Sequence, residues 1–302
     1  MTRRRCTDAT TPLANTTSTP RDSRLGSYDV LAPLARGGTA GVYLAEHGIT
    51  KQRVALKVLD AYYCNHAEIV DRLLAERTVS QRARHPGLLD IQVADTSAHG
   101  VPYLVMEYLD GENLGALLER GQIAIDAVIA ISAQVASAVA ALHAHGIIHR
   151  DVKPDNTIVL YQTTQTGWPR VKVIDYGVAR FIEDGPLPDA AIAGTPCYMA
   201  PEQWRGAPTT KSDVYAFGVM LYELVTGKQP FTGTLPQLMV AHCEKLPERL
   251  STSRSDVPAE LERLIMRAMS KDPDFRPTMA ELEIGLARLL SSYETQLQAA
   301  AG

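Results

Sequence analysis

The chain has 302 residues, of which 45% are hydrophobic and 21% charged, a composition typical of a globular protein with a sizeable core. Thirty Lys and Arg against 34 Asp and Glu give a net charge of −4, which argues against a nucleic-acid binder or a polybasic membrane module. Cys6, Cys64, Cys197 and Cys243 lack any metal-binding spacing, and the N-terminus lacks the apolar stretch of a secretory signal. We therefore expect free thiols and a cytoplasmic location.

The first part of the chain is predicted to be rich in strands. Residues 1–26 hold Thr, Ser, Pro and Arg with almost no apolar residues, so we expect a disordered tail there. A charged helical pattern covers 67–84 and ends at a His-Pro-Gly turn. Strand patterns begin at Tyr28 and recur at 42–44, 53–59, 88–94 and 102–108.

The second part is predicted to be mainly helical. Between the helices, short strand-like pieces lie at 157–160 and 170–174. The stretch 127–148 has no charged residue and imitates a membrane span, but polar residues interrupt it, so we favour a buried central helix and no membrane span. Helical patterns lie at 114–120, 126–143, 212–226, 236–243, 259–269 and 279–290. A strand-rich part followed by a helix-rich part predicts two lobes.

Five motifs that carry chemistry or architecture follow one another in the second half. They are HRDVKPDN at 149–156, DYG at 175–177, GTPCYMAPE at 194–202, SDVYAFG at 212–218 and DPDFRP at 272–277. In this order they resemble the protein kinases, and in detail the eukaryotic-like serine/threonine kinases of bacteria. The resemblance covers about 28–290. It implies an α+β, bilobal protein-kinase fold, with a small β-rich N-lobe at 27–108, a larger helical C-lobe at 109–291 and a C-terminal tail at 292–302.

The resemblance implies roles in phosphoryl transfer for three residues of these motifs. The transferred phosphoryl group passes through a loose transition state, so catalysis consists mainly of positioning and charge neutralisation. Asp151 would accept the proton of the substrate hydroxyl, and Lys153 would steady the transferring phosphate. Thr195 would bridge these two side chains beneath the substrate, and its presence with Lys153 matches serine/threonine rather than tyrosine kinases.

ATP and a divalent metal are implied by the same resemblance, at a cleft between the lobes. Lys57 would hold the α- and β-phosphates while paired to Glu76 of the first helix, with Glu68 as the alternative partner. Asp175 and Asn156 would ligate the metal. Their hard oxygen atoms suit Mg²⁺, and Mn²⁺ is an acceptable substitute.

Further positions are implied to contact the nucleotide. Met106 takes the gatekeeper position before a hinge at 107–109, and Glu112 would reach the ribose. Plain core packing is the alternative for the apolar members of this set. The implied contacts, besides Lys57, are Leu34, Ala35, Gly37, Gly38, Val42, Ala55, Met106, Glu107, Leu109, Glu112 and Ile158.

Two motifs depart from the family pattern. Ala35 and Ala40 replace two of the three glycines of the phosphate loop, of which Gly37 remains. An alanine methyl costs flexibility but removes no amide donor, so we expect slower or weaker use of ATP. Tyr176 replaces the usual Phe of the Asp-Phe-Gly triplet, and a buried Tyr hydroxyl requires a partner.

The activation segment carries a third peculiarity. Kinases with an Arg before the catalytic Asp, here Arg150, usually need a phosphorylated segment to satisfy it, yet residues 178–194 contain no Ser, Thr or Tyr. Our hypothesis is that Glu183, Asp184 or Asp189 pairs with Arg150 instead. Activity would then not depend on phosphorylation of this segment.

The remaining motif residues have architectural roles. Glu202 and Arg276 are expected to form a buried ion pair that braces the helical lobe, and Asp213 is expected to anchor the backbone of the catalytic loop.

The sequence thus predicts a serine/threonine protein kinase that acts on protein substrates and on itself, as a monomer or homodimer. The alternative, which Ala35 and Ala40 favour weakly, is a pseudokinase scaffold with weak nucleotide binding. A small-molecule kinase is disfavoured, because residues 194–202 build a peptide-docking platform in protein kinases.

Overall fold

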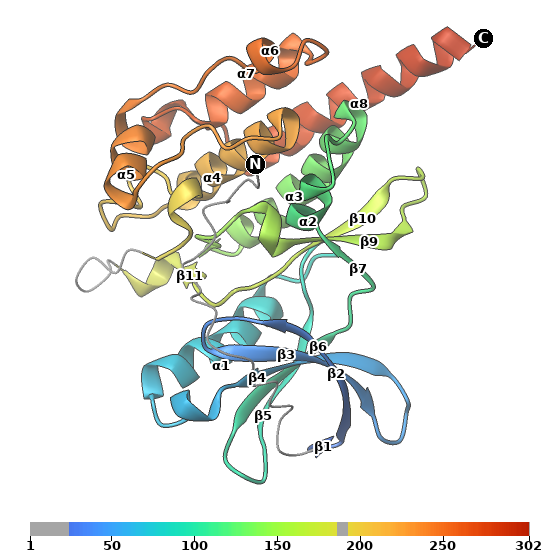
Figure 1. The fold of residues 1–302 in the computed structure, drawn as a ribbon, viewed down its shortest axis with the longest axis vertical. Helices are drawn as coiled ribbons and strands as arrows, with labels where there is room; N and C mark the ends of the chain where they lie inside the picture. The colour runs from blue at the N-terminus through green and yellow to red at the C-terminus, as the bar shows by residue number, and fades with distance from the viewer. Residues whose placement is uncertain (1–23, 186–192, 302) are drawn as a thin grey trace.

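The computed structural model describes residues 24–185 and 193–301, which form two lobes stacked along the longest axis of the molecule (Figure 1). The smaller lobe is an antiparallel six-stranded sheet in the order β1-β2-β3-β4-β6-β5 with one helix against it. Its elements are β1 (Arg24–Leu25), β2 (Tyr28–Arg36), β3 (Ala40–His47), β4 (Arg53–Leu59), α1 (Ala67–Arg82), β5 (Ile91–Thr96) and β6 (Pro102–Glu107).

The first strand of the small lobe begins before the predicted boundary. Residues 24–26 were expected to belong to the disordered tail, but strand β1 pairs with β2, and Leu25 is only 2% exposed. Leu25 packs in a small core with Tyr103 and Val105, so an apolar contact and a strand pairing together attach residues 24–25 to the sheet. Residues 1–23 lie outside the described part.

Strand β4 shows how the sequence of the sheet positions a functional side chain. Successive side chains of a strand point to opposite faces. Val54, Leu56 and Val58 enter the small core of the sheet, whereas Ala55 and Leu59 join the main core that includes helix α1. Lys57 has the same parity as these two residues, so it lies on the face toward α1.

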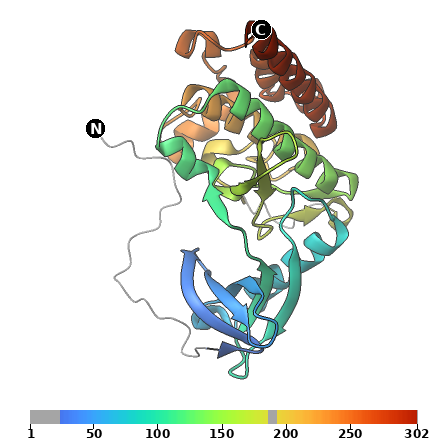
Figure 2. The same cartoon turned by 90° about the vertical axis from the view of Figure 1, so that its right-hand side faces the viewer.

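The larger lobe is helical with three short strand pairings at its junction with the small lobe (Figures 1 and 2). Strands β10, β9 and β7 form one sheet, and β11 pairs with β8. Its helices are α2 (Leu114–Glu119), α3 (Ile125–Ala144), α4 (Thr210–Thr226), α5 (Leu235–Glu244), α6 (Leu250–Ser253), α7 (Ala259–Ala268) and α8 (Met279–Ala301), and its strands β7 (Gly111–Asn113), β8 (Ile147–Ile148), β9 (Thr157–Thr163), β10 (Pro169–Val173) and β11 (Arg180–Phe181).

Helix α3 is the apolar stretch that imitates a membrane span. It is the one helix in the described ranges that is long and apolar enough to cross a membrane. In the fold it packs against α8, α4 and β10, and Val128, Val135 and Leu142 are completely buried. The predicted role as a central helix of the larger lobe therefore matches its position.

Helix α8 runs further than the sequence pattern suggested. The expected C-terminal tail starts at 292, but the helix continues through Ala301 and projects beyond the body of the lobe (Figure 1). The part up to Leu286 is anchored by apolar side chains, with Leu282 and Leu286 completely buried. The final turns continue without a proline or glycine that would end a helix.

Candidate active site

Lys57 of strand β4 connects the two lobes through two carboxylates. Its Nζ donates to Glu76 Oε1 at 2.6 Å and to Asp175 Oδ1 at 3.1 Å. Glu76 belongs to helix α1 and is only 3% exposed, whereas the alternative Glu68 is exposed at the start of the helix. Burial disfavours the Lys57 ammonium, but the two carboxylates outweigh this effect and raise its pKa well above the usual value. The side chain therefore stays charged at neutral pH.

Asp175 adopts a backbone conformation that is unusual for a residue with a side chain. Its φ is 67°, in the left-handed region, and its side chain is 46% exposed. Burial raises its pKa, but the Lys57 ammonium and the Gly177 amide outweigh burial and hold the pKa below its usual value. A Cβ on Gly177 would lie 3.3 Å from both Asp175 Oδ1 and Glu76 Oε1, so glycine leaves room for the two carboxylates.

Three predicted site residues surround the carboxylate of a fourth, Asp151, which lies in the loop after strand β8. Lys153 Nζ lies 2.8 Å from Asp151 Oδ2 and donates to Thr195 Oγ1 at 2.5 Å. Thr195 donates to Asp151 Oδ1 twice, from its hydroxyl at 2.7 Å and from its backbone amide at 2.8 Å. Asn156 Nδ2 donates to Asp151 Oδ2 at 2.9 Å. The bridge expected of Thr195 is present, and the carboxylate has a fixed orientation.

Asp213 of helix α4 holds this loop in place from below, as the sequence predicted. Its carboxylate, which is completely buried, accepts the backbone amides of His149 at 2.8 Å and Arg150 at 2.7 Å, and it lies 2.8 Å from His143 Nε2. Arg150 has a φ of 69°, so the loop turns through a left-handed conformation immediately before Asp151. The anchored amides keep the loop in this conformation.

The predicted nucleotide contacts on strands β2, β3, β4 and β6 lie in two neighbouring cross-strand rows of the sheet. Ala35 pairs with Val42, and Val42 pairs with Lys57 across the next strand boundary. Ala55 pairs with Met106 one strand further. Leu34, Gly37 and Gly38 lie at or beside the β2–β3 hairpin, where Gly37 N–H donates to the Ala40 carbonyl at 2.9 Å and a Cβ on Gly38 would meet nothing within 4 Å.

The remaining predicted contacts lie where the chain passes into the larger lobe. The Glu107 carboxylate accepts the Asp90 amide at 2.8 Å and Lys172 Nζ at 2.6 Å, so this side chain braces the hinge that leads to Leu109. Glu112 forms an ion pair with Arg120. Ile158 pairs with Asn113 across β9 and β7. The ion pair of Glu112 competes with the ribose contact expected for its carboxylate.

Gln203 is a positioning residue that the sequence reasoning missed. Its amide nitrogen donates to the carbonyls of Arg150 at 2.9 Å and Ala193 at 2.6 Å, and the residue is 3% exposed. It therefore joins the catalytic loop to the end of the activation segment. The only signal in the sequence is its place directly after Glu202 in the GTPCYMAPE motif.

The start of the activation segment contacts helix α1. Glu183 lies 2.5 Å from Arg82, whose guanidinium also stacks 4.3 Å from the Phe181 ring centroid. Glu183 was one of the carboxylates expected to pair with Arg150, and the ion pair it forms is with Arg82 instead. Asp184 forms no ion pair within 24–185 and 193–301, and Asp189 lies outside these ranges.

The oxygen donors at the junction of the two lobes fit a divalent metal that also binds ligands from outside the protein. Within the described ranges no three His, Cys, Asp or Glu side chains cluster as a metal site. Because Asn156 Nδ2 donates to Asp151, its amide oxygen remains to serve as a ligand alongside the exposed Asp175 carboxylate. Two protein oxygens completed by phosphate and water oxygens suit Mg²⁺.

Comparison with known proteins places these features in one family. A profile described as the protein kinase domain matches residues 28–283. The chain is 40% identical to serine/threonine-protein kinase Pkn1 of Myxococcus xanthus, over 84% of this chain and 36% of that protein. It is 38% identical to serine/threonine-protein kinase PkaA of Streptomyces coelicolor (86% and 49%) and 36% identical to serine/threonine-protein kinase PknB of Mycolicibacterium smegmatis (87% and 43%).

The chain thus spans between about a third and a half of the length of these relatives. The family and the bilobal fold predicted from the ordered motifs are both confirmed, and the predicted serine/threonine kinase type agrees with the names of the relatives. Family membership also implies use of ATP and a divalent metal in general terms. The chain belongs to the protein kinase family.

Proposed function

We propose that this chain is an ATP-dependent protein kinase that phosphorylates serine and threonine hydroxyls of proteins, including its own. The observation that carries the proposal is the Asp151 carboxylate, which Lys153, Thr195 and Asn156 all contact at 2.9 Å or less. Three polar side chains contact one half-buried carboxylate, which is more contacts than are needed to hold a loop in place. They fit a proton acceptor with a fixed orientation.

These residues would act together in one transfer of the γ-phosphoryl group from ATP to a hydroxyl. The substrate hydroxyl oxygen forms a bond to the γ-phosphorus of ATP, the bond to the leaving ADP oxygen breaks, and Asp151 accepts the hydroxyl proton. Lys153, 2.8 Å from Asp151, neutralises charge on the group in transfer, and Lys57 holds the α- and β-phosphates. Mg²⁺ held by the oxygens of Asp175 and Asn156 would supply further charge neutralisation.

The proposal also covers the metal, the acceptor residues, the location and the oligomeric state. Mg²⁺ or Mn²⁺ is proposed as the metal because the chain offers two oxygen donors and leaves the other positions to phosphate and water. Protein serine and threonine are proposed as acceptors because Lys153 and Thr195 are joined by a 2.5 Å hydrogen bond and the relatives are named serine/threonine kinases. We propose the cytoplasm as the location and either a monomer or a homodimer as the working form.

The decisive experiment is transfer of labelled γ-phosphate from ATP to a generic basic protein, with Asp151→Asn as the matched variant. We expect Asp151→Asn to lower the rate about 10²–10⁴-fold, the usual contribution of a general base. The amide preserves the shape of the side chain, and a cooperative thermal transition should show that the variant is folded. Labelled phosphoserine or phosphothreonine is the expected product.

Two outcomes would contradict the proposal. Equal label from wild type and Asp151→Asn would assign the transfer to a contaminant. No label from wild type, together with ATP-dependent thermal stabilisation, would favour the pseudokinase scaffold.

A further inference from the structure

Lys271 places its amine against the interior of the larger lobe without a carboxylate to neutralise it. The residue follows helix α7 and is half-buried. Its Nζ donates to the Tyr215 hydroxyl at 3.0 Å and to the Ala241 carbonyl at 3.4 Å, and it lies 4.7 Å from the centroid of the Phe231 ring. Among the described side chains, no Asp or Glu forms an ion pair with it. An aromatic ring attracts a cation, but it carries no full negative charge.

A second cation lies beside this amine. The Arg276 guanidinium and Lys271 Nζ lie 4.9 and 5.3 Å from the centroid of the same Tyr215 ring. Both oxygens of Glu202 are bound by Arg276, so this carboxylate is already neutralised. A desolvated lysine beside another cation is favoured in its neutral, nucleophilic form. Burial lowers the pKa of Lys271 to about 8, and Arg276 acts in the same direction while Cys243 opposes it.

Tyr215 can serve the amine in both of its protonation states. Its hydroxyl accepts a hydrogen bond from Lys271 Nζ and lies 3.1 Å from His242 Nδ1. A hydroxyl can also rotate and donate to the lone pair of a neutral amine. Burial, followed by the Lys271 ammonium, lowers the pKa of His242 to about 3, so the imidazole is neutral at physiological pH. The neighbours of the amine therefore tolerate the loss of its charge.

We propose that Lys271 is a nucleophilic lysine and a site of acylation by small acyl phosphates. The Nζ lone pair forms a bond to the acyl carbonyl carbon, and the bond from this carbon to the phosphate oxygen breaks. Inorganic phosphate leaves and takes up the proton that the amine loses. The acylated lysine is uncharged and keeps one N–H, which can donate to the Tyr215 hydroxyl. This site is independent of the proposed phosphoryl transfer, because no step involves Asp151 or ATP.

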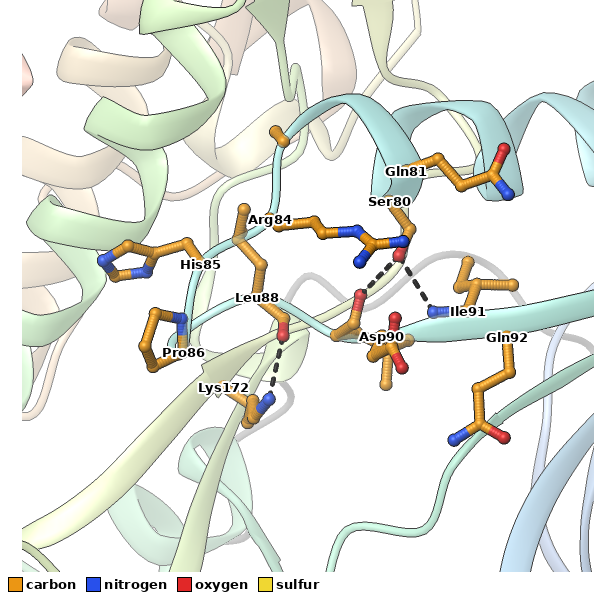
Figure 3. Close-up of a pocket in the computed structure, with 12 residues that line it drawn as sticks. Ser80, Gln81, Arg84, His85, Pro86, Leu88, Asp90, Ile91, Gln92 and Lys172 are labelled. Atoms are coloured by element: carbon orange, nitrogen blue, oxygen red, sulfur yellow. Dashed lines mark hydrogen bonds between the residues drawn. The ribbon is translucent and has the colours of Figure 1, made fainter.

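Lys172 is the matched comparison, because it is a half-buried lysine that has a carboxylate partner. Its Nζ donates to the Leu88 carbonyl at 3.0 Å (Figure 3) and lies 2.6 Å from Glu107 Oε1. It also lines a cavity of about 460 Å³, so a small reagent can approach it. If access alone decided reactivity, Lys172 would react at least as fast as Lys271. If charge decides, Lys172 is slower, because the Glu107 carboxylate stabilises the ammonium form, which is not a nucleophile.

The test is treatment of the full chain with acetyl phosphate at pH 7.5, followed by peptide mass spectrometry of the acetylated lysines. At this pH an amine of pKa about 8 is neutral about 10²-fold more often than one with the usual lysine pKa of about 10.4. Burial and lower basicity offset part of this gain, so we expect Lys271 to react about tenfold faster than Lys172. Lys51, whose side chain is 64% exposed and pairs with Glu46 at 3.0 Å, controls for exposure and should also be slower.

A pair of variants separates charge from shape. Cys243 is half-buried on helix α5 and close enough to Lys271 to influence its charge. Cys243→Asp supplies the missing carboxylate and should slow acetylation of Lys271 about tenfold, whereas Cys243→Asn, of the same shape, should not. In wild type the rate at Lys271 should level off above about pH 8, whereas a lysine of usual pKa gains rate up to about pH 10. A rate at Lys271 that does not exceed those at Lys172 and Lys51, or that Cys243→Asp leaves unchanged, would overturn the proposal.

Discussion

Two networks of ion pairs between a cation and carboxylates, one within the larger lobe and one between the lobes, have different roles. Arg276 has a side chain with 0% exposure, and its guanidinium pairs with both oxygens of Glu202 at 2.6 and 2.9 Å. It also donates to the carbonyls of Ser270, Lys211 and Lys271. Every one of these partners belongs to the larger lobe, so the network closes within one lobe.

The network of Lys57 is built from separate pieces. Its partners come from helix α1 and from the segment after β10, and the Asp175 side chain remains 46% exposed. A buried charge is stable only when its partners satisfy it, as they do around Arg276. Both contacts of the Asp175 carboxylate, from Lys57 and from the Gly177 amide, are made to Oδ1, so Oδ2 retains the capacity to bind a further cation. The difference indicates that the first network stabilises the fold, whereas the second is arranged for a ligand.

Replacement of each cation by methionine gives the largest expected effect and tests this distinction directly. Arg276→Met leaves the Glu202 carboxylate buried without its charge partner and should lower the free energy of unfolding by about 3–5 kcal/mol. Lys57→Met should cost less stability, because Glu76 can take up a proton, but should lower phosphoryl transfer by about 10²–10³-fold. Urea unfolding and labelled-ATP assays measure the two quantities.

Arg263→Met is the control for these two variants. Arg263 pairs with Glu260 on the exposed face of helix α7, and we expect no measurable change in either assay. A loss of stability at Lys57 as large as that at Arg276 would contradict the division of roles between the two networks.

The architecture was predictable where a strong pattern covers a whole element. The strand pattern at 53–59 coincides with β4, and the apolar run at 126–143 differs from α3 by one residue at each end. The Lys57–Glu76 contact was also predictable, because the ordered motifs of the family identify both residues. The strand and the helix follow from the local periodicity of apolar residues, and the ion pair follows from the order of the motifs. A single sequence contains both kinds of information.

Contacts between segments without a shared motif were not predictable. The hydroxyls of Ser80 and Tyr176 meet at the Leu89 carbonyl although Tyr176 is 87 residues away from Leu89, and Glu183 meets Arg82 across 101 residues. The sequence indicated that a buried tyrosine hydroxyl needs an acceptor. Because every residue has a backbone carbonyl, the sequence does not identify which one accepts. Only the packing of α1 against the larger lobe identifies these partners.

The second prediction concerns the pH dependence of the stability of the larger lobe. Its expected effect is of intermediate size. His242 is completely buried beside Tyr215, and burial, followed by the nearby Lys271 ammonium, lowers its pKa to about 3. The unfolded chain takes up this proton below about pH 6.5, whereas the folded protein does not until about pH 3. Stability should therefore fall as pH decreases, by about 2 kcal/mol between pH 6.5 and 5, in urea unfolding experiments.

His242→Gln serves as the control for the pH experiment. Glutamine retains a hydrogen-bond acceptor for the Tyr215 hydroxyl but does not titrate. The variant should be less stable than wild type at pH 7 and should lose much less stability on acidification. An unchanged pH slope in the variant would assign the acid sensitivity to other groups.

The ion pair between Arg82 and Glu183 should give the smallest effect, although it joins helix α1 to the activation segment. Both side chains are exposed, at 47% and 65%, so water and salt screen their attraction. A double-mutant cycle with Arg82→Gln and Glu183→Gln should give a coupling of about 0.5 kcal/mol or less, which disappears at high salt. Each single variant should change the rate of phosphoryl transfer less than twofold. A larger coupling, or one that persists at 1 M salt as measured by thermal unfolding, would show that this pair contributes more to the contact between helix α1 and the activation segment than screened charges allow.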